Sequence, residues 1–166
     1  MSLTDQIMAS RRLAGRVRRY HTWPTIREQT VADHTWQVMR IYVELFGSPS
    51  PDVWEYILWH DSTEMHTGDI PFPVKRDNPE LAAEICQLEC RARQKMGIPY
   101  LDIPDPLKLR AKLCDLLEMR EFGLEEQMLG NGYGYPIVTR TTWAASQVAE
   151  QLGTDMVAQV NKWMET

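Results

Sequence analysis

The sequence predicts an all-α protein, and three observations lead to this fold class. Apolar residues recur at helical spacing along most of the 166 residues, and no stretch alternates with a period of two for long enough to predict a strand. Residues that start and end helices bracket these periodic stretches. The length is that of one domain, which can bury about two-thirds of its unfolded surface. We therefore expect a single helical domain over residues 1–166.

The first clear helix is expected over residues 30–46. Its opening threonine is followed three positions later by Asp33, which resembles a capping box with the shorter acid in place of glutamate, and Gly47 ends the apolar pattern. The next helix is expected to begin at Pro51, because proline is favoured at the first helical position. We expect this helix to carry His60 at its end.

Four further helices are predicted by the same signals, over residues 79–96, 104–129, 142–152 and 155–164. Two segments rich in proline and glycine, residues 65–76 and 130–136, are expected to be non-helical. The tryptophans mostly occupy apolar helical positions, which predicts that they lie in the core. Trp23, which precedes Pro24 in a loop, is the expected exception.

The charge distribution favours small anionic ligands over nucleic acid. The net charge of −5 argues against a protein that coats a duplex, yet basic residues cluster at residues 11–19 and at Lys75-Arg76. The sequence has no apolar run of about 18 residues and no secretory-signal pattern at its N-terminus, so we expect neither a membrane span nor secretion. The three cysteines lack zinc-knuckle spacing, which indicates reduced thiols and a cytoplasmic protein.

Two histidines and two aspartates form the strongest candidate site. His60 and Asp61 are adjacent where a tryptophan-rich helix meets a polar loop. His34 lies upstream, and Asp115 lies downstream between inward-facing leucines, where a carboxylate without a cation would be costly to bury. Imidazole nitrogen and carboxylate oxygen are good ligands of divalent cations. This set predicts one divalent metal per subunit, with Mn²⁺, Co²⁺, Zn²⁺ or Fe²⁺ favoured over Ca²⁺.

Other polar residues are candidates for catalysis and substrate binding. Glu64 follows Asp61 by three positions, so its carboxylate could act as general acid or base beside a metal, although an ordinary surface glutamate is the alternative. Asp69 follows a glycine in a loop, where it could accept a hydrogen bond from a sugar hydroxyl or form an Asx-turn. The candidate phosphate ligands are Lys75, Arg76, Lys112 and the pair Arg18-Arg19.

These residues together resemble a known family. His34, His60-Asp61 and Asp115 match the H…HD…D signature of HD-domain phosphohydrolases in order and approximate spacing. The resemblance extends to the 5′-deoxynucleotidase branch through Arg19-Tyr20, Thr30-Val-Ala-Asp-His34, His60-Asp61-Ser-Thr-Glu64 and Thr67-Gly-Asp69-Ile-Pro-Phe-Pro-Val-Lys75, and it covers about residues 10 to 145. It implies a single HD-domain helical bundle. The Arg19-Tyr-His-Thr-Trp-Pro24 segment also resembles phage dATP triphosphohydrolases of this branch.

The resemblance implies a role for each matching residue. Arg19 would contact phosphate and Tyr20 would pack near the sugar and help to exclude a 2′-hydroxyl. Glu64 would act on the attacking water, and Asp69 would hold the sugar 3′-hydroxyl. In that branch the aromatic residue is typically tryptophan, whereas this chain has Tyr20. The resemblance also implies one bound Co, Mn or Zn ion, a homo-oligomer of two or more subunits, and, for a phage protein, the host cytoplasm.

The expected activity is metal-dependent hydrolysis of free 2′-deoxynucleotides. The number of cationic side chains favours a triphosphate, with dATP converted to deoxyadenosine and triphosphate. A 5′-deoxynucleotidase that releases phosphate from a deoxynucleoside monophosphate is the first alternative. A non-catalytic, metal-stabilised module that binds nucleotide is the second, but it leaves Glu64 and Asp69 without a task.

Overall fold

The computed structural model describes residues 2, 5–6 and 11–165, and these residues are mostly helical. Within this part of the chain the extended pairing is confined to one isolated bridge between Arg18 and Thr30, so the all-α prediction is confirmed. No helix among the described residues is long and apolar enough to cross a bilayer. The N-terminal stretch in which we looked for a secretory signal lies partly outside the described residues.

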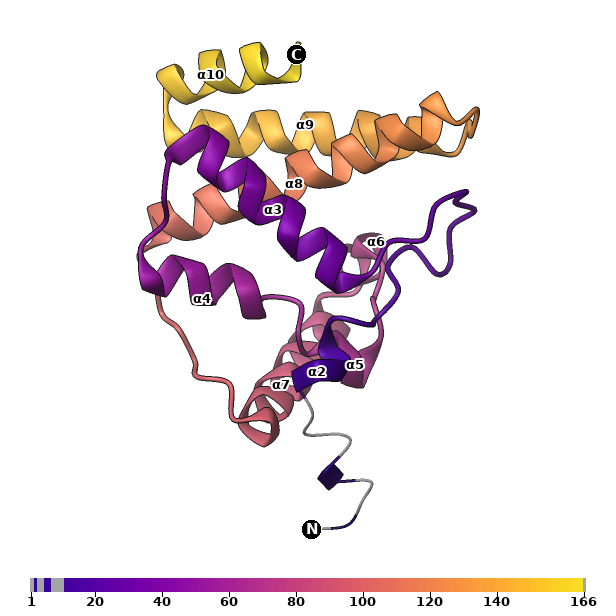
Figure 1. Ribbon diagram of the computed structural model, residues 1–166, viewed down its shortest axis with the longest axis vertical. Coiled ribbons are helices and arrows are strands. Elements are labelled where there is room, and N and C mark those ends of the chain that lie inside the picture. The colour runs from indigo at the N-terminus through magenta and orange to yellow at the C-terminus, as the bar shows by residue number, and fades with distance from the viewer. Residues whose placement is uncertain (1, 3–4, 7–10, 166) are drawn as a thin grey trace. The chain divides into compact units, whose positions relative to one another are not determined.

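The helices follow the chain in this order (Figure 1): α2 (Arg11–Ala14), α3 (Val31–Phe46), α4 (Pro51–Trp59), α5 (Glu64–Thr67), α6 (Phe72–Asp77), α7 (Pro79–Met96), α8 (Asp105–Met128), α9 (Gly134–Leu152) and α10 (Thr154–Met164).

The predicted helix ends are confirmed where the signal is local. Thr30 N and Oγ1 both donate to Asp33 Oδ2, at 3.0 and 2.6 Å, and Asp33 N donates back to Thr30 Oγ1 at 3.2 Å. This is the reciprocal pattern of a capping box, and it begins α3. At the C-terminal end of α7, Gly97 takes the left-handed conformation with φ 62°, and its N–H donates to carbonyls in the last turn of the helix.

Three predictions of where helices lie are wrong. Helix α4 ends at Trp59, so His60 lies in the turn that follows it. The segment expected to be non-helical between residues 65 and 76 contains most of α5 and of α6, because prolines at the N-cap and in the first turn of α6 do not disturb helical hydrogen bonding. Helix α9 begins at Gly134 rather than at residue 142, inside the second segment expected to be a loop.

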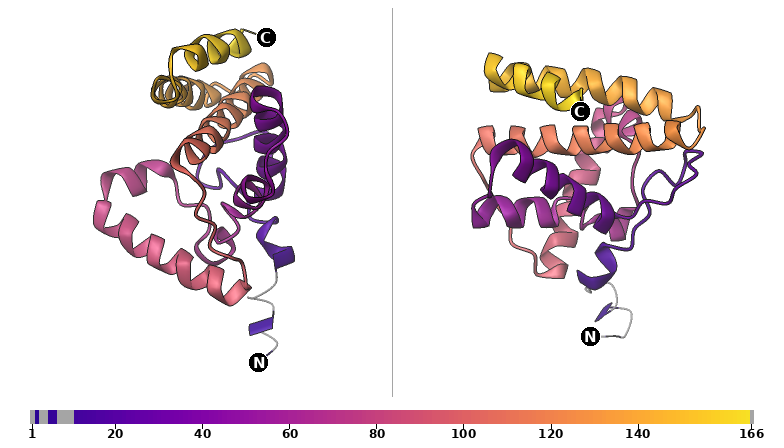
Figure 2. Two further views of the ribbon diagram at one scale, coloured as in Figure 1. Left: turned by 90° about the vertical axis from the view of Figure 1, so that its left-hand side faces the viewer. Right: turned by 45° about the horizontal axis from the view of Figure 1, so that its top comes forward.

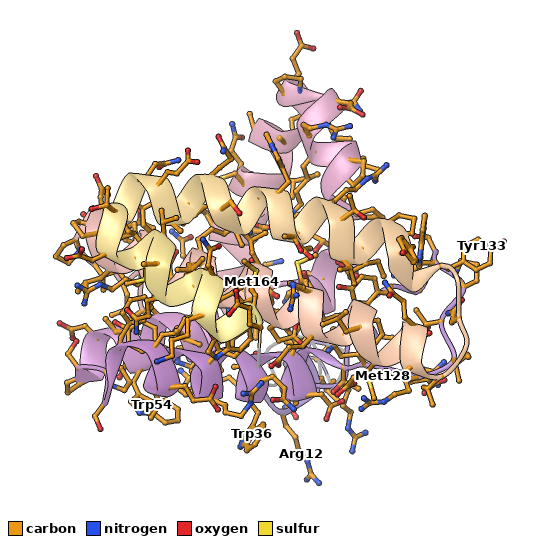
Figure 3. All side chains as sticks on the ribbon, turned by 90° about the horizontal axis from the view of Figure 1, so that it is seen from above. Arg12, Trp36, Trp54, Met128, Tyr133 and Met164 are labelled. Carbon is orange, nitrogen blue, oxygen red and sulfur yellow. The ribbon has the colours of Figure 1, made fainter. Side chains whose placement is uncertain are left out.

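The expectation that the tryptophans are buried is wrong for three of them. Trp36, Trp54 and Trp143 are 63%, 49% and 68% exposed. Trp36 and Trp54 extend outward from their helices (Figure 3). Helix α3 instead buries the stripe that contains Val38, Ile41 and neighbouring apolar residues, so the apolar spacing was right but the face assigned to the tryptophan was not.

Contacts within the chain define two compact units. The first comprises Met1–Pro24, Glu28–Thr35 and Leu58–Leu101, and the second comprises Thr25–Arg27, Trp36–Ile57 and Asp102–Thr166. The expectation of a single domain over residues 1–166 stays a prediction.

The second unit holds the larger hydrophobic core. Its helices α8 and α9 run antiparallel and side by side, and α10 turns back along α9 (Figure 2). Glycines permit the close approach of α8 and α9, because a Cβ added to Gly134 would clash with the carbonyl oxygen of Gly123. The fully buried side chains of this core include Val38, Ile41, Val53, Ile57, Leu113 and Leu117.

The first unit has a smaller core around the end of α7. Ala14, Met96 and Ile98 are buried together, and Trp59 and Met65 pack against them. Arg11 caps the C-terminal end of α7, since its Nε donates to the Met96 carbonyl at 2.9 Å and its Nη2 donates to the Gly97 carbonyl. A cation at a helix C-terminus satisfies carbonyls that have no partner within the helix.

Candidate metal centre

Three predicted ligands come together in the first unit. His34 is buried in the first turn of α3, and His60 and Asp61 lie in the turn after α4. The two Nε2 atoms are 3.3 Å apart, and Asp61 Oδ2 lies 3.2 Å from His60 Nε2 and 3.5 Å from His34 Nε2. Among the described residues, these are the only three histidine, cysteine or acidic side chains whose ligand atoms converge in this way.

The spacing of these atoms fits a single divalent cation. Nitrogen and oxygen ligands lie about 2.0–2.2 Å from a metal such as zinc, which places two ligands of one tetrahedral ion about 3.3–3.6 Å apart. The observed separations of 3.3 and 3.5 Å fall within this range, and the 3.2 Å separation lies just below it. The donor set of two imidazoles and one carboxylate suits Zn²⁺, Co²⁺ or Mn²⁺. His34, His60 and Asp61 could therefore hold a metal ion.

Local hydrogen bonds position the ligands. The capping box starts α3 directly before His34, whose backbone N–H donates to the Thr30 carbonyl at 3.0 Å. After α4, the N–H and Oγ of Ser62 both donate to the Trp59 carbonyl, at 3.2 and 2.7 Å. The Glu64 N–H donates to the Asp61 carbonyl at 3.1 Å. These bonds close a tight turn that projects His60 and Asp61 from consecutive positions.

Asp61 is held in its ionised form. Burial of the carboxylate raises its pKa, but His60, Arg19 and His34 outweigh burial and keep the pKa of Asp61 well below its usual range. Arg19 contributes through a 2.6 Å ion pair from Nη1 to Asp61 Oδ2, and the Arg19 side chain is only 8% exposed. An ionised carboxylate is the form that binds a cation.

Glu64 combines burial with an unpartnered oxygen. The residue is 9% exposed, and Glu64 Oε2 has no hydrogen-bond partner among the described residues. Burial raises the pKa of Glu64 to about 8, and the negative charge of Asp61 adds to the effect. The alternative of an ordinary surface glutamate is therefore wrong. A buried carboxyl whose pKa is raised towards neutrality has the properties of a general acid or base.

Tyr20 and Asp69 are joined directly. The backbone N–H of Tyr20 donates to Asp69 Oδ2 at 2.9 Å. Tyr20 has φ 55°, the only positive φ at a non-glycine residue in the described chain. Such a conformation costs of order 1–3 kcal/mol and persists where surrounding contacts require it. The Arg19 guanidinium also lies 5.9 Å from the centre of the Tyr20 ring. The Arg19-Tyr20 segment therefore contacts Asp61 through the Arg19 side chain and Asp69 through the Tyr20 backbone.

The remaining predicted phosphate ligands are paired with acids. Lys75 Nζ lies 3.3 Å from Glu89 Oε1, and Arg76 Nε lies 2.6 Å from Asp77 Oδ1. In the second unit, Lys112 Nζ donates to Asp115 Oδ2 at 2.6 Å. The half-buried Asp115 carboxylate thus has the Lys112 ammonium beside it. Its role as a fourth metal ligand stays a prediction.

Sequence reasoning missed Arg93. This residue of α7 lies in the first unit, and its Nη2 donates to the carbonyls of Trp59 and His60 at 3.1 and 3.2 Å. Its position in the last turn of a helix indicates a C-terminal capping cation, but nothing in the local sequence indicates that it contacts the His60 turn.

Comparison with known proteins gives the family. The sequence profile of the 5′-deoxynucleotidase YfbR-like family matches residues 9–121, a span that contains every candidate residue named above. The chain belongs to this family. The resemblance to HD-domain phosphohydrolases of the 5′-deoxynucleotidase branch is thereby confirmed.

Individual relatives match over shorter spans. The chain is 34% identical over 93 residues to 5′-deoxynucleotidase VV1113 of Vibrio vulnificus, which covers 49% of this chain and 48% of that protein. It is 32% identical over 133 residues to the dATP triphosphohydrolase of Salmonella phage PMBT28, covering 70% of this chain and 64% of that one. The chain therefore spans about half the length of the first curated relatives that it matches.

A solved structure shows the fold. The HD phosphohydrolase of cyanophage S-2L, bound to dA and one catalytic Zn²⁺ ion, superposes with a TM-score of 0.64 over 89% of this chain and 83% of that chain, at 21% identity. The predicted HD-domain helical fold is confirmed.

Proposed function

We propose that the protein is a metal-dependent phosphohydrolase that acts on free 2′-deoxynucleotides. The observation that carries this proposal is the convergence of His34, His60 and Asp61 close in sequence to the buried Glu64, whose Oε2 has no hydrogen-bond partner among the described residues. Membership of the YfbR-like family supports the same reaction class. A non-catalytic module leaves this buried polar group without a task, since burying a polar group without a hydrogen bond costs free energy.

Different residues of the site are proposed to bind the metal and to transfer protons. A divalent ion held by His34, His60 and Asp61, with Asp115 as the fourth ligand implied by the signature, would supply Lewis-acid chemistry at the phosphate, and Co²⁺, Mn²⁺ and Zn²⁺ are the proposed ions. Glu64 Oε2 takes a proton from the attacking water and later gives one to the leaving 5′-oxygen. The reaction breaks the bond between phosphorus and that oxygen.

The substrate is proposed to lie against the Arg19-Tyr20 segment. A guanidinium has five N–H donors, so Arg19 can contact a phosphate oxygen while it holds Asp61. Asp69 uses Oδ2 to accept the Tyr20 N–H, and a carboxylate has enough acceptor sites to take a sugar 3′-hydroxyl as well. Tyr20 would then limit the space for a 2′-hydroxyl.

Within this reaction class we propose dATP triphosphohydrolase as the first candidate. It is supported by the phage relative of that name, which matches 70% of the chain. The excess of cations is weaker support than the sequence suggested, because Lys75, Arg76 and Lys112 each pair with an acid. The 5′-deoxynucleotidase reaction is the second candidate, and the family description and most named relatives favour it.

The proposed partner is a small deoxynucleotide rather than a nucleic-acid duplex. We also propose a homo-oligomer and a cytoplasmic location, the host cytoplasm in the case of a phage protein, as the resemblance implies. Light scattering coupled to size-exclusion chromatography tests the oligomeric state, and a mass of 19.3 kDa would identify a monomer.

A product assay separates the two candidates. Purified protein with Mn²⁺ or Co²⁺ is incubated with dNMPs, dNTPs and ribonucleotides, and the products are separated by ion-exchange chromatography. A triphosphohydrolase yields deoxyadenosine and tripolyphosphate from dATP, whereas a nucleotidase releases orthophosphate from dAMP. Lys75→Ala and Arg76→Ala should reduce dATP turnover more than dAMP turnover, because the distal phosphates need extra cations. Rapid dAMP cleavage with inert dATP would select the 5′-deoxynucleotidase, and equal turnover of ATP and dATP would refute the role of Tyr20.

A further inference from the structure

We infer that Arg93 is a positioning residue that orients the His60-Asp61 turn for metal binding. The inference rests on the proposed function, since it adds a residue to the same metal centre. Arg93 lies on α7 in the first unit, more than thirty positions along the chain from the turn that it contacts.

The guanidinium of Arg93 bridges two consecutive carbonyls. Its Nη2 lies 3.1 Å from the Trp59 carbonyl oxygen and 3.2 Å from the His60 carbonyl oxygen. Trp59 is the last residue of α4, and carbonyls at a helix C-terminus lack partners within the helix. The positive charge of Arg93 also complements the negative end of the helix dipole. Arg93 thus caps α4 at the point where the helix gives way to the ligand-bearing turn.

Holding these two carbonyls determines the direction of the ligand side chains. Each peptide group is planar and rigid, so a hydrogen bond to its carbonyl oxygen restricts the rotation of the whole plane. The Trp59 carbonyl belongs to the plane before the His60 Cα, and the His60 carbonyl belongs to the plane after it. With rotation of both planes restricted, φ and ψ of His60 are restricted, and so is the direction of its Cα–Cβ bond. The second plane also ends at the Asp61 Cα, which constrains that ligand too.

The part of α7 that carries Arg93 is itself firmly held. The Ile98 N–H donates to the Arg93 carbonyl at 3.0 Å, within the C-terminal cap formed by Gly97. Arg11 donates to the Met96 carbonyl at 2.9 Å, one turn further along. Met96 and Ile98 are 3% and 5% exposed. The guanidinium therefore extends from a fixed base, which a positioning residue requires.

Hydrogen-bond partners one step removed from a metal typically account for 10–100-fold in metal affinity. Ser62 leaves the turn only partly dependent on Arg93, because Ser62 also donates to the Trp59 carbonyl. Arg93 also donates to the His60 carbonyl. Loss of Arg93 removes one donor from each of the two planes and should therefore loosen the convergence of His60 and Asp61.

The test measures metal binding rather than turnover. The Arg93→Met and Arg93→Lys variants are stripped of metal and titrated with Mn²⁺ and with Co²⁺ by calorimetry, and the thermal midpoint of each metal-free protein is measured by circular dichroism. Arg91→Met serves as the matched control, because Arg91 is an exposed arginine two residues earlier on the same helix. We expect Arg93→Met to weaken the metal Kd by about 10–100-fold. The shorter lysine should give an intermediate loss, and Arg91→Met should match the wild type.

Each outcome decides between the possibilities. An Arg93→Met protein with a lowered midpoint and a Kd within twofold of the wild type would show a purely structural role and overturn the inference. If Arg93→Met does not fold, Arg93→Lys decides alone: a folded Arg93→Lys protein must bind metal at least threefold more weakly than Arg91→Met. If the wild type binds neither ion, the proposed function fails, and this result is distinct from a wild type that binds normally beside unaffected Arg93 variants.

Discussion

Replacement of Glu64 by glutamine should remove catalysis while the metal centre stays intact. Glutamine has nearly the same volume and fills the same buried space, so neither a cavity nor a change of core packing is expected. Glu64 is not among the three residues whose ligand atoms converge, so metal content should not change. The neutral amide, however, cannot take a proton from water or give one to a leaving oxygen.

The expected loss in turnover number is about 10²–10⁴-fold, the usual contribution of a general acid or base, which corresponds to about 2.7–5.5 kcal/mol in the activation barrier. The loss should appear in kcat at saturating substrate rather than in KM, because Glu64 acts on water and not on the bound nucleotide. Glu64→Ala should lose at least as much.

The assay combines kinetics with metal analysis. Turnover of dATP and of dAMP is measured for the wild type, Glu64→Gln and the control Glu84→Gln, which changes an exposed glutamate on α7. Bound metal is measured on the same samples by elemental analysis. A Glu64→Gln protein that keeps its metal and turns over its best substrate near the wild-type rate would refute the assignment of proton transfer to Glu64.

Two further predictions concern substrate binding and stability. Asp69→Ala should raise KM and lower kcat for deoxynucleotides, because the 3′-hydroxyl loses its acceptor; unchanged kinetics would remove Asp69 from the sugar site. Glu126 is fully buried in the second unit and accepts the N–H groups of Ile26 and Arg27 at 2.7 and 2.8 Å and of Asn131 at 2.6 Å. Burial raises the pKa of Glu126, but these hydrogen bonds outweigh burial and lower the pKa below the ordinary 4.5. Ionised Glu126 therefore stabilises the fold above pH 4.5, and this contribution is lost as the pH falls below the lowered pKa. Glu126→Gln should therefore lower the free energy of unfolding by about 1–3 kcal/mol at pH 7, measured with urea, and the difference should shrink as the pH falls below 4.5; a difference independent of pH would contradict this account.

Local signals in the sequence predicted the fold where local contacts determine it. The Thr30-Asp33 capping box and the C-terminal Gly97 are complete within four or five residues, and both helix ends were predicted correctly. The start of α9 was missed because the glycine-rich segment before it resembles a loop, whereas in the structure Gly134 begins α9 and packs closely against the Gly123 carbonyl of α8. A glycine-rich segment looks like a loop until a neighbouring helix makes use of its missing side chains.

The residues of the candidate site were likewise predicted where the signal is local and missed where it depends on distant contacts. His34, His60 and Asp61 were found because their residue types and order are themselves the signal, and the structure brings all three together. Lys75 was expected to bind phosphate, but its partner Glu89 comes from another helix, and no local pattern predicts that ion pair. Arg93 was missed for a related reason, because it acts on backbone carbonyls that any residue could provide.

The metal content of the purified protein tests the central claim most directly. Metal-free wild type, His34→Ala and the control His21→Ala, which changes an exposed histidine, are reloaded with Zn²⁺ or Mn²⁺, passed through a desalting column and measured by elemental analysis. The account predicts one ion per subunit in the wild type and in His21→Ala, and less than about one-tenth of an ion in His34→Ala, since His34 provides one of the three converging ligand atoms. A wild type without stoichiometric metal, or a His34→Ala protein that retains one ion per subunit, would contradict it.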